Sequence, residues 1–300
     1  MIEIKKSELD KLRIIGKGCC ATIYGLSEGE VLKLYDKQTR NASELVRKEF
    51  EITKACCELG LSANRAFDLY ECEGVYGASY EYVSGKTMLD AINCGESING
   101  MIRELALIGH KIHSLEADEK RFPDAARVFD EILRFVEGWV SAEEYEHMKN
   151  LIDAIPQCRK LIHGDFHPGN VIVGNGRFVL IDIGGAGFGH PVYDFISMYR
   201  MMRKASDAGD KTGIYRQIYE NYLEYYFEKS LLAKAGDALT GILDVFYYMS
   251  VLPDVVAYVP DRDACPPEIR KYVDNVMGKI MGTGVDTFRE LFGETDDLFC

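Results

Sequence analysis

The sequence has few prolines, a single tryptophan and fewer basic than acidic residues. Only 8 of its 300 residues are proline, which sets it apart from collagen-like and proline-rich disordered chains. The 35 Lys and Arg residues against 48 Asp and Glu residues give a net charge of −13. Because a nucleic acid backbone is usually held by a basic surface, we expect no nucleic acid partner.

The sequence also lacks paired cysteines and long apolar runs. Its nine cysteines include no C-x-x-C pair, and its first residues, MIEIKKSELDKL, lack the apolar core of a signal peptide. We therefore expect reduced thiols and a cytoplasmic protein. The most apolar window, 242–259, is interrupted by Asp244, Pro253 and Asp254, so we expect neither a membrane span nor a membrane partner. The composition favours no particular oligomeric state.

The first 83 residues have the pattern of a small antiparallel sheet with one helix. Short β-like segments with turn signals between them predict strands at 11–15, 21–26, 30–35, 66–72 and 75–83. Between the third and fourth, apolar residues at helical spacing predict a helix over 43–60, with a buried face that includes Leu45 and Ile52.

After residue 88 the pattern becomes mainly helical. One apolar stripe runs from Met101 to Leu115, and a second contains Val128, Ile132, Phe135 and Trp139. Further helices are predicted from Ser141, which begins a capping box with Glu144, and over 192–204, 213–229, 231–250 and 267–281. A hairpin is predicted in the middle, from strands at 171–173 and 177–182 around a Gly-Asn-Gly turn.

The segment HGDFHPGN, residues 163–170, carries the strongest chemical signal. It contains Asp165 and Asn170, and Asp182 follows across the predicted hairpin. Mg²⁺ takes hard oxygen ligands and is often held by few protein groups together with phosphate oxygens. Phosphoryl transfer also needs a base that orients a hydroxyl group. The segment therefore predicts phosphoryl transfer with Mg²⁺, unless its glycines, proline and asparagine form only a tight surface loop.

The segments HGDFHPGN and IDIGGAGFGHPVYD resemble those of the aminoglycoside phosphotransferase and choline kinase superfamily, the small-molecule kinases of the protein-kinase-like fold. The resemblance covers most of residues 12–200 and is sharpest over 161–195. It implies that Asp165 is the catalytic base and that Asn170 and Asp182 are the Mg²⁺ ligands. It gives three further residues supporting roles, with His163 and His167 as loop organisers and Asp194 as a structural carboxylate.

The same resemblance implies a nucleotide site in the N-terminal part. Gly16 and Gly18 lie in a turn between two predicted strands that resembles the kinase glycine-rich loop, although Ala21 replaces its third glycine. Lys33 has the position of the lysine that holds the α- and β-phosphates and takes part in catalysis. Its carboxylate partner is Glu49 or, if the helix is shifted, Glu51.

Residues 80–85 resemble the hinge that pairs with a purine, so the nucleotide site is expected to include Glu81, Tyr82 and Val83. An interdomain linker would have the same residues. We expect an α+β, bilobal protein-kinase-like fold. Its nucleotide-binding lobe, residues 1–82, has five antiparallel strands and one main helix, and its catalytic and substrate-binding lobe, residues 83–300, is mostly helical.

The region after residue 200 is rich in Tyr, Asp and Glu, and the chain ends with ETDDLFC. Aromatic faces and carboxylates attract organic cations, but tyrosines at helical spacing are also common in cores.

The two histidines His110 and His113 lie three apart on a predicted helix without an evident third metal ligand, and we expect His113 to have a packing role.

These features predict a Mg²⁺-dependent kinase that transfers the γ-phosphoryl group of ATP or GTP to a hydroxyl of a small molecule, with a cationic amino sugar or amino alcohol as the candidate. Only seven residues separate Asp182 from His190, which leaves no room for the peptide-docking segment of protein kinases. A nucleotide-binding pseudokinase with a regulatory role is the alternative. It is disfavoured because Lys33, Asp165, Asn170 and Asp182 are all present.

Overall fold

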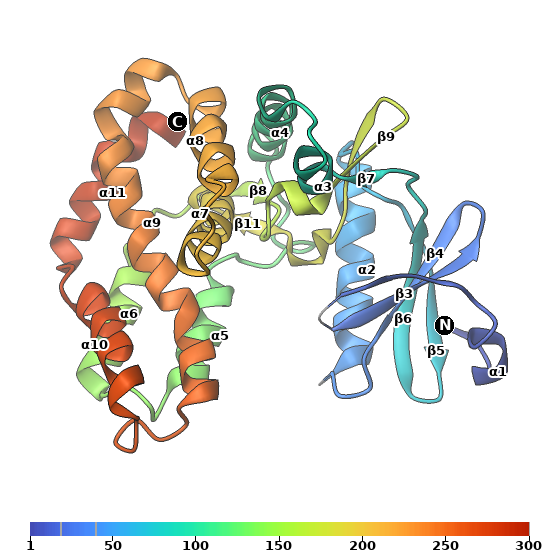
Figure 1. Ribbon diagram of the computed structural model, residues 1–300, viewed down its shortest axis with the longest axis horizontal. Coiled ribbons are helices and arrows are strands. Elements are labelled where there is room, and N and C mark those ends of the chain that lie inside the picture. The colour runs from blue at the N-terminus through green and yellow to red at the C-terminus, as the bar shows by residue number, and fades with distance from the viewer. Residues whose placement is uncertain (19, 40, 300) are drawn as a thin grey trace. The chain divides into compact units, whose positions relative to one another are not determined.

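The computed structural model of the chain describes residues 1–18, 20–39 and 41–299, with the backbone alone at 296 and 297 (Figure 1). The chain divides into two compact units, which are described separately. The first contains residues 1–97, 120–122 and 167–186, and the second contains 98–119, 123–166 and the residues from 187 onward. The boundaries of these units differ in kind from the lobes predicted at 1–82 and 83–300. The two lobes therefore stay a prediction.

The first unit is built on a six-stranded sheet with the order β1-β5-β6-β4-β3-β2. The α+β fold class is confirmed, but the sheet has one strand more than predicted, because β1 adds to its edge parallel to β5. The other neighbouring strands are antiparallel. The strands are β1 (Ile2–Glu3), β2 (Ile14–Lys17), β3 (Ala21–Ser27), β4 (Glu30–Tyr35), β5 (Ala66–Cys72) and β6 (Val75–Glu81).

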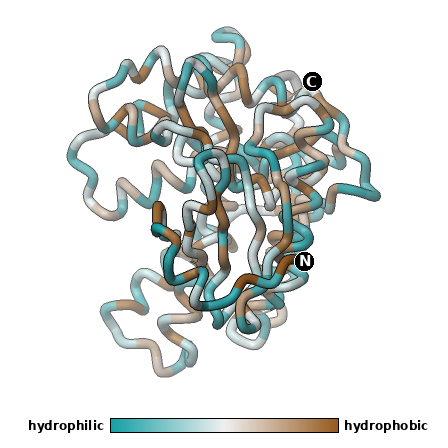
Figure 2. The backbone as a smooth tube through the Cα atoms, turned by 90° about the vertical axis from the view of Figure 1, so that its right-hand side faces the viewer, coloured by the Kyte–Doolittle hydropathy of each residue, from teal (hydrophilic) through white to brown (hydrophobic). Residues whose placement is uncertain are grey.

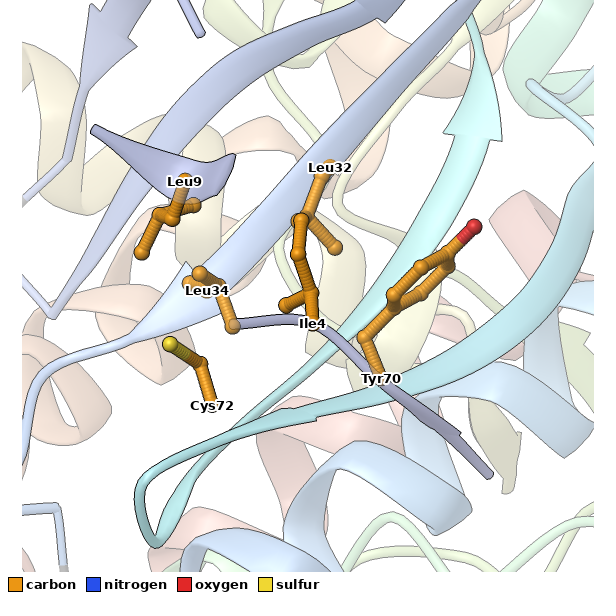
Figure 3. Packing of buried hydrophobic residues seen from close by; sticks show 6 residues of the cluster. All are labelled: Ile4, Leu9, Leu32, Leu34, Tyr70 and Cys72. Atoms are coloured by element: carbon orange, nitrogen blue, oxygen red, sulfur yellow. The ribbon is translucent and has the colours of Figure 1, made fainter. Parts of the chain in front are cut away.

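Both faces of this sheet are covered, because alternate residues of β4 point to opposite sides. Leu32 and Leu34 pack with Ile4 and with Leu9 of α1 (Lys6–Leu9) in the cluster of Figure 3. On the other side Tyr35 packs in a cluster with buried residues of α2 (Ala42–Glu58). Figure 2, in which the sheet faces the viewer, shows hydrophobic and hydrophilic residues interspersed along the strands, and several strand residues are exposed.

The first unit also holds the predicted hairpin. Asn175 and Gly176 connect β9 and β10, with φ of 51° and 70°, as a type I′ turn requires. The hairpin continues into a third strand, β7, which pairs with β9. The elements of this part are β7 (Lys86–Thr87), α3 (Met88–Asn93), the 3₁₀ turn η1 (Pro168–Asn170), β9 (Val171–Gly174), β10 (Arg177–Leu180) and the 3₁₀ turn η2 (Ile183–Gly185).

The described part of the second unit is helical apart from the short pair β8 and β11. Ser141 begins α6 with the predicted capping box, since its hydroxyl accepts from the Glu144 N–H at 3.2 Å. The elements are α4 (Ile98–His113), α5 (Arg127–Val136), α6 (Ala142–Asp153), β8 (Lys160–Ile162), β11 (Gly187–Gly189), α7 (Val192–Asp207), α8 (Ile214–Tyr226), α9 (Lys229–Tyr258), α10 (Pro267–Met281) and α11 (Val285–Phe299).

The predicted face of α5 is wrong at Val128 and Phe135, and that of α2 is wrong at Leu45 but confirmed at Ile52, which is buried. In α5, Val128 and Phe135 are 48% and 54% exposed, whereas Phe129, Leu133 and Val136 are buried. This helix is apolar over more than one face, and the Phe129 face is the one that meets α9, with the rings of Phe129 and Phe246 4.8 Å apart. In α2 the predicted core residue Leu45 is 40% exposed, and its neighbour Val46 is buried instead.

Helix α9 is long and apolar enough to cross a membrane, by length and composition alone. In the structure 61% of its most apolar window is buried inside the protein, as in the core helix of many globular proteins. Its central residues Leu239, Leu243 and Phe246 are completely buried. The absence of a membrane span therefore stays a prediction.

The packing of Figure 3 predicts that Leu32→Ala strongly destabilises the first unit. Leu32 is completely buried, and a buried Leu→Ala change costs about 2–5 kcal/mol through lost burial and the cavity that remains. Urea unfolding of the whole chain measures the loss. Ile14→Ala, at a residue 58% exposed on the same sheet, is the control, and an equal loss in both variants would contradict the packing.

The core of the second unit also predicts a pH dependence of stability. His190 lies against the rings of Phe292 and Phe299 and accepts the Val192 N–H at its Nδ1. Burial, followed by the neighbouring His113, lowers the pKa of His190 to about 4. The unfolded side chain titrates near pH 6.5, so the unfolded state binds more protons between these values, and stability is lost as the pH falls from about 6.5 to about 4.

We expect this side chain to account for about 2 kcal/mol of stability lost between pH 7 and pH 5. The measurement is urea unfolding of the wild type and of His190→Gln at both pH values. The variant should lose less stability than the wild type over this interval. An identical pH dependence of the two proteins would show that His190 titrates normally in the folded state.

Candidate active site

The first unit joins three of the predicted site residues in one ion network. The ammonium Nζ of Lys33 donates to Glu49 Oε1 at 2.8 Å and to Asp182 Oδ1 at 2.6 Å. The alternative partner Glu51 is exposed on another face of α2. Of the two carboxylates left open by the sequence, Glu49 is therefore the one that pairs with Lys33.

Each member of this network is placed by a different element. Lys33 lies in the middle of β4, between Ile23 of β3 and Ala78 of β6. Glu49 lies on the buried face of α2. Asp182 follows β10 in a left-handed conformation, with φ 54° and ψ 37°, which asparagine and aspartate adopt more readily than most residues.

The turn after Asp182 lies close against Glu49. A Cβ at Gly184 would lie 2.4 Å from the Glu49 Cγ. Any larger residue would displace the Glu49 side chain, so glycine is required here by the approach of η2 to α2.

Charge pairing dominates the electrostatics of the network. Burial opposes the positive charge of Lys33, but the carboxylates of Glu49 and Asp182 outweigh it and raise the pKa of Lys33. The lysine therefore stays charged at any physiological pH.

The two predicted metal ligands, Asn170 and Asp182, lie on neighbouring segments of the first unit. The N–H of Ile181 donates to the backbone oxygen of Asn170 at 3.0 Å, which brings Asp182 next to the end of η1. Asn170 is buried and the Asp182 side chain is 52% exposed. Among the described residues no group of three or more His, Cys, Asp or Glu could hold a metal ion. One carboxylate and one amide suit Mg²⁺ that takes its other oxygens from phosphate and water.

The glycine turn has room for a Cβ at both glycines. A Cβ at Gly16 or at Gly18 would meet its nearest neighbours only at 3.6 Å, an ordinary contact, and neither glycine has a positive φ. The fold therefore does not require glycine at either position. A turn without side chains leaves its backbone N–H groups open to a ligand. The neighbouring Cys19 lies outside the described residues.

The three predicted hinge residues differ in their backbone bonds. The N–H of Glu81 donates to Arg65 O at 2.8 Å, and the N–H of Tyr82 donates to Gly29 O at 2.9 Å. Both donors are thus used within the first unit. The N–H of Val83 has no such partner in the described part of the chain, which makes it the candidate of the three for pairing with a purine.

The predicted base Asp165 belongs to the second unit and lies in the loop after β8. The buried carboxylate of Asp194 fixes the backbone of this loop, since Oδ2 accepts the N–H of His163 at 2.9 Å and Oδ1 that of Gly164 at 2.8 Å. Nδ1 of His163 accepts the N–H of Asp165 at 3.4 Å. Asp165 itself is exposed.

The second loop histidine, His167, belongs to the first unit and accepts the N–H of Gly169 at 3.0 Å. Its bond lies at the start of η1, which leads to the predicted metal ligand Asn170. The backbone of this turn is thus fixed locally by a side chain of the same motif.

His113 does more than pack in the core, because it also contacts Asp194, the carboxylate that fixes the loop. Its Nε2 is 3.0 Å from Asp194 Oδ2, and its Nδ1 is 2.7 Å from the hydroxyl of Tyr226. No local pattern in the sequence predicts this contact of Tyr226, because it joins α8 to α4. His110 stacks on the ring of Tyr226 instead of joining a metal site.

Tyr35 is not among the predicted site residues, yet its hydroxyl donates to Glu49 Oε2. This residue has a local signal. Tyr35 lies two residues after Lys33 on β4, and alternate residues of a strand share one face. Tyr35 therefore lies on the side of the strand from which Glu49 reaches Lys33.

Most tyrosines after residue 200 are packed in the core of the second unit. Tyr219, Tyr222 and Tyr226 are buried. Asp244 accepts from Tyr199 at 2.7 Å and pairs with Arg203. The cationic acceptor pocket expected from these residues stays a prediction, and Cys300 and the side chains of Asp296 and Asp297 lie outside the described residues.

The chain is similar to known proteins in sequence profile and in fold. The sequence profile of the phosphotransferase enzyme family matches residues 12–234, whereas no curated protein sequence matches significantly. The streptomycin–ATP–APH(2")-IIa ternary complex has a similar structure, with a TM-score of 0.57, 17% identity and coverage of 93% of each chain.

Two further structures are similar. A choline/ethanolamine kinase family protein from Mesorhizobium loti has a TM-score of 0.55 and 14% identity over 94% of this chain and 92% of that chain. The GDP complex of wild-type aminoglycoside 2'-phosphotransferase-IIIa has a TM-score of 0.56 and 12% identity over 91% and 93%. These TM-scores show the shared fold, and the predicted resemblance is confirmed. The chain belongs to the phosphotransferase enzyme family, whose small-molecule kinases share its fold.

Proposed function

We propose that this protein transfers the γ-phosphoryl group of ATP or GTP to a hydroxyl group of a small molecule, with Mg²⁺ bound to the nucleotide. The observation that carries the proposal is the lysine bonded to two carboxylates from different elements, Glu49 and Asp182. Such an arrangement presents a fixed ammonium group beside an accessible carboxylate, which suits a phosphate chain carrying a metal ion.

Each nucleotide-binding role falls on a described residue of the first unit. Lys33 would hold the phosphates, with the open backbone of Gly16 and Gly18 against them. Asn170 and Asp182 would be the protein ligands of Mg²⁺, which neutralises charge on the phosphate oxygens. Lys33 and the backbone N–H groups of the turn would keep the phosphate chain in one orientation.

Asp165 would act as the base. In the reaction its carboxylate accepts the proton of the acceptor hydroxyl, whose oxygen forms a bond to the γ-phosphorus as the bond from that phosphorus to the bridging β,γ-oxygen breaks. The products are the phosphate ester and the nucleoside diphosphate. The bonds from His163 and Gly164 to Asp194 support this role, because they fix the backbone on which Asp165 stands.

The proposed acceptor class is a cationic amino sugar or amino alcohol. Three observations support it. Complexes of similar fold contain streptomycin, gentamicin or kanamycin, the chain carries a net charge of −13, and the short segment after Asp182 excludes the usual docking of a peptide. The alternative, a pseudokinase that binds nucleotide without transfer, is distinguished by the experiment below.

The test is a panel of amino sugars, amino alcohols and neutral sugars, assayed for acceptor-dependent consumption of ATP and GTP. We expect a cationic acceptor to be phosphorylated. Asp165→Asn should lower kcat by about 10²–10⁴-fold, the usual contribution of a general base, while nucleotide Kd stays nearly unchanged. Asp118→Asn, at another carboxylate of the second unit, is the control.

Several outcomes would contradict parts of this proposal. Nucleotide binding without turnover for any acceptor would favour the pseudokinase. Turnover with a neutral or anionic acceptor alone would reject the cationic class. Near-full activity of Asp165→Asn would remove the role assigned to Asp165.

The metal ligands generate a separate prediction. Ligands that bind only the folded state raise its stability, so Tm should rise more with nucleotide plus Mg²⁺ than with either alone. Thermal unfolding with and without each component measures this. In Asp182→Ala the additional rise due to Mg²⁺ should disappear. Because this variant also loses the bond to Lys33, the comparison uses the shift on ligand addition and not Tm itself.

A rise that is equal with and without Mg²⁺ in the wild type would count against both Asn170 and Asp182. An additional rise that persists in Asp182→Ala would assign the metal to other residues.

A further inference from the structure

The two oxygens of the Glu49 carboxylate have different partners. Oε1 accepts from the ammonium of Lys33 at 2.8 Å, and Oε2 accepts from the hydroxyl of Tyr35. Glu49 is only 6% exposed, so water cannot easily replace either donor. The orientation of this carboxylate therefore depends on both side chains of β4.

The register of β4 explains how one strand supplies both donors. Lys33 and Tyr35 are two residues apart and so lie on the same face of the sheet, the face covered by α2. The Tyr35 ring packs in the cluster that contains Val46 and Phe50 of α2, and it also lies 5.3 Å from Lys33 Nζ. The ring is thus held by packing, which limits the movement of its hydroxyl.

The hydroxyl of Tyr35 is a permanent donor. Burial and then the charge of Glu49 raise the pKa of Tyr35, so the phenol stays protonated at physiological pH. Burial and then Glu49 raise the pKa of Tyr80 in the same way. The carboxylate is therefore surrounded by neutral phenols and one ammonium group, a setting in which it stays an acceptor.

We propose that Tyr35 is a positioning residue of the nucleotide site, which holds Glu49 so that the carboxylate presents one oxygen to Lys33. This role rests on the proposed function. An ammonium group has three N–H donors, and here one bond goes to Glu49 and one to Asp182. If Oε2 lost its donor, Glu49 could turn both oxygens toward Lys33 and compete with the phosphates for the ammonium group.

The role differs from simple packing in a measurable way. A residue that acts through Lys33 should affect the binding of phosphate groups and not the binding of the base and sugar. We therefore compare the Kd of ATP or GTP, whichever the wild type binds, with the Kd of the matching nucleoside. Tyr35→Phe keeps the ring and removes only the hydroxyl. Tyr24→Phe, on β3 of the same sheet and packed against the opposite cluster, is the matched control.

In Tyr35→Phe we expect the Kd of the triphosphate to rise about 3- to 10-fold, because hydrogen bonds to charged groups contribute more than neutral ones. The Kd of the nucleoside should stay unchanged, and Tyr24→Phe should change neither. In a Lys33→Ala background, Tyr35→Phe should cause no further rise, since the group on which it acts is absent.

Three results would overturn the role of Tyr35: an unchanged triphosphate Kd, equal weakening of triphosphate and nucleoside, or a full additional effect without Lys33. These are distinct from failure of the proposed function, in which the wild type itself binds no nucleotide. In that case the role of Tyr35 is rejected together with the function on which it rests.

Discussion

The first unit is organised around a buried charge pair. Lys33 and Glu49 have side chains that are 17% and 8% exposed, and a charge taken out of water is unfavourable unless a partner and further hydrogen bonds compensate it. Meeting this requirement needs β4, α2 and the turn after β10 at fixed relative positions. The close approach of Gly184 to Glu49 and the bond from Tyr35 follow from the same constraint.

The second unit also contains a buried carboxylate, Asp194, which fixes the backbone of a loop. Asp194 is 1% exposed and accepts from two backbone N–H groups and faces the ring of His113. A buried carboxylate that receives several donors orients the groups around it, because each lost bond would leave a charge without compensation. The backbone before Asp165 is held in this way, although Asp165 itself stays exposed. In both units a buried carboxylate thus fixes the surroundings of an accessible one.

The aromatic residues near the C-terminus show why composition is a weak guide to a binding site. Tyrosines after residue 200 suggested an aromatic pocket, yet Phe195, Tyr222, Tyr226 and Phe227 pack on one another with ring distances of 4.8–5.6 Å. A tyrosine side chain is large and mostly apolar, so it serves a core as well as a ligand. Which of the two it does depends on the helices that pack around it.

The sequence by itself determined the elements with strong local signals. The strands at 30–35 and 66–72, the helix at 267–281 and the hairpin turn at Asn175 and Gly176 follow from periodicity and turn chemistry over a few residues. The motif order likewise identified Lys33, Asp165, Asn170 and Asp182 as the residues to examine. The tertiary structure alone decided that Glu49 and not Glu51 meets Lys33, that the Phe129 face of α5 is buried, and that Tyr226 meets His113. These outcomes depend on which face of a helix meets a distant element, and a rotation of one residue, about 100°, exchanges one face for another without changing the local pattern.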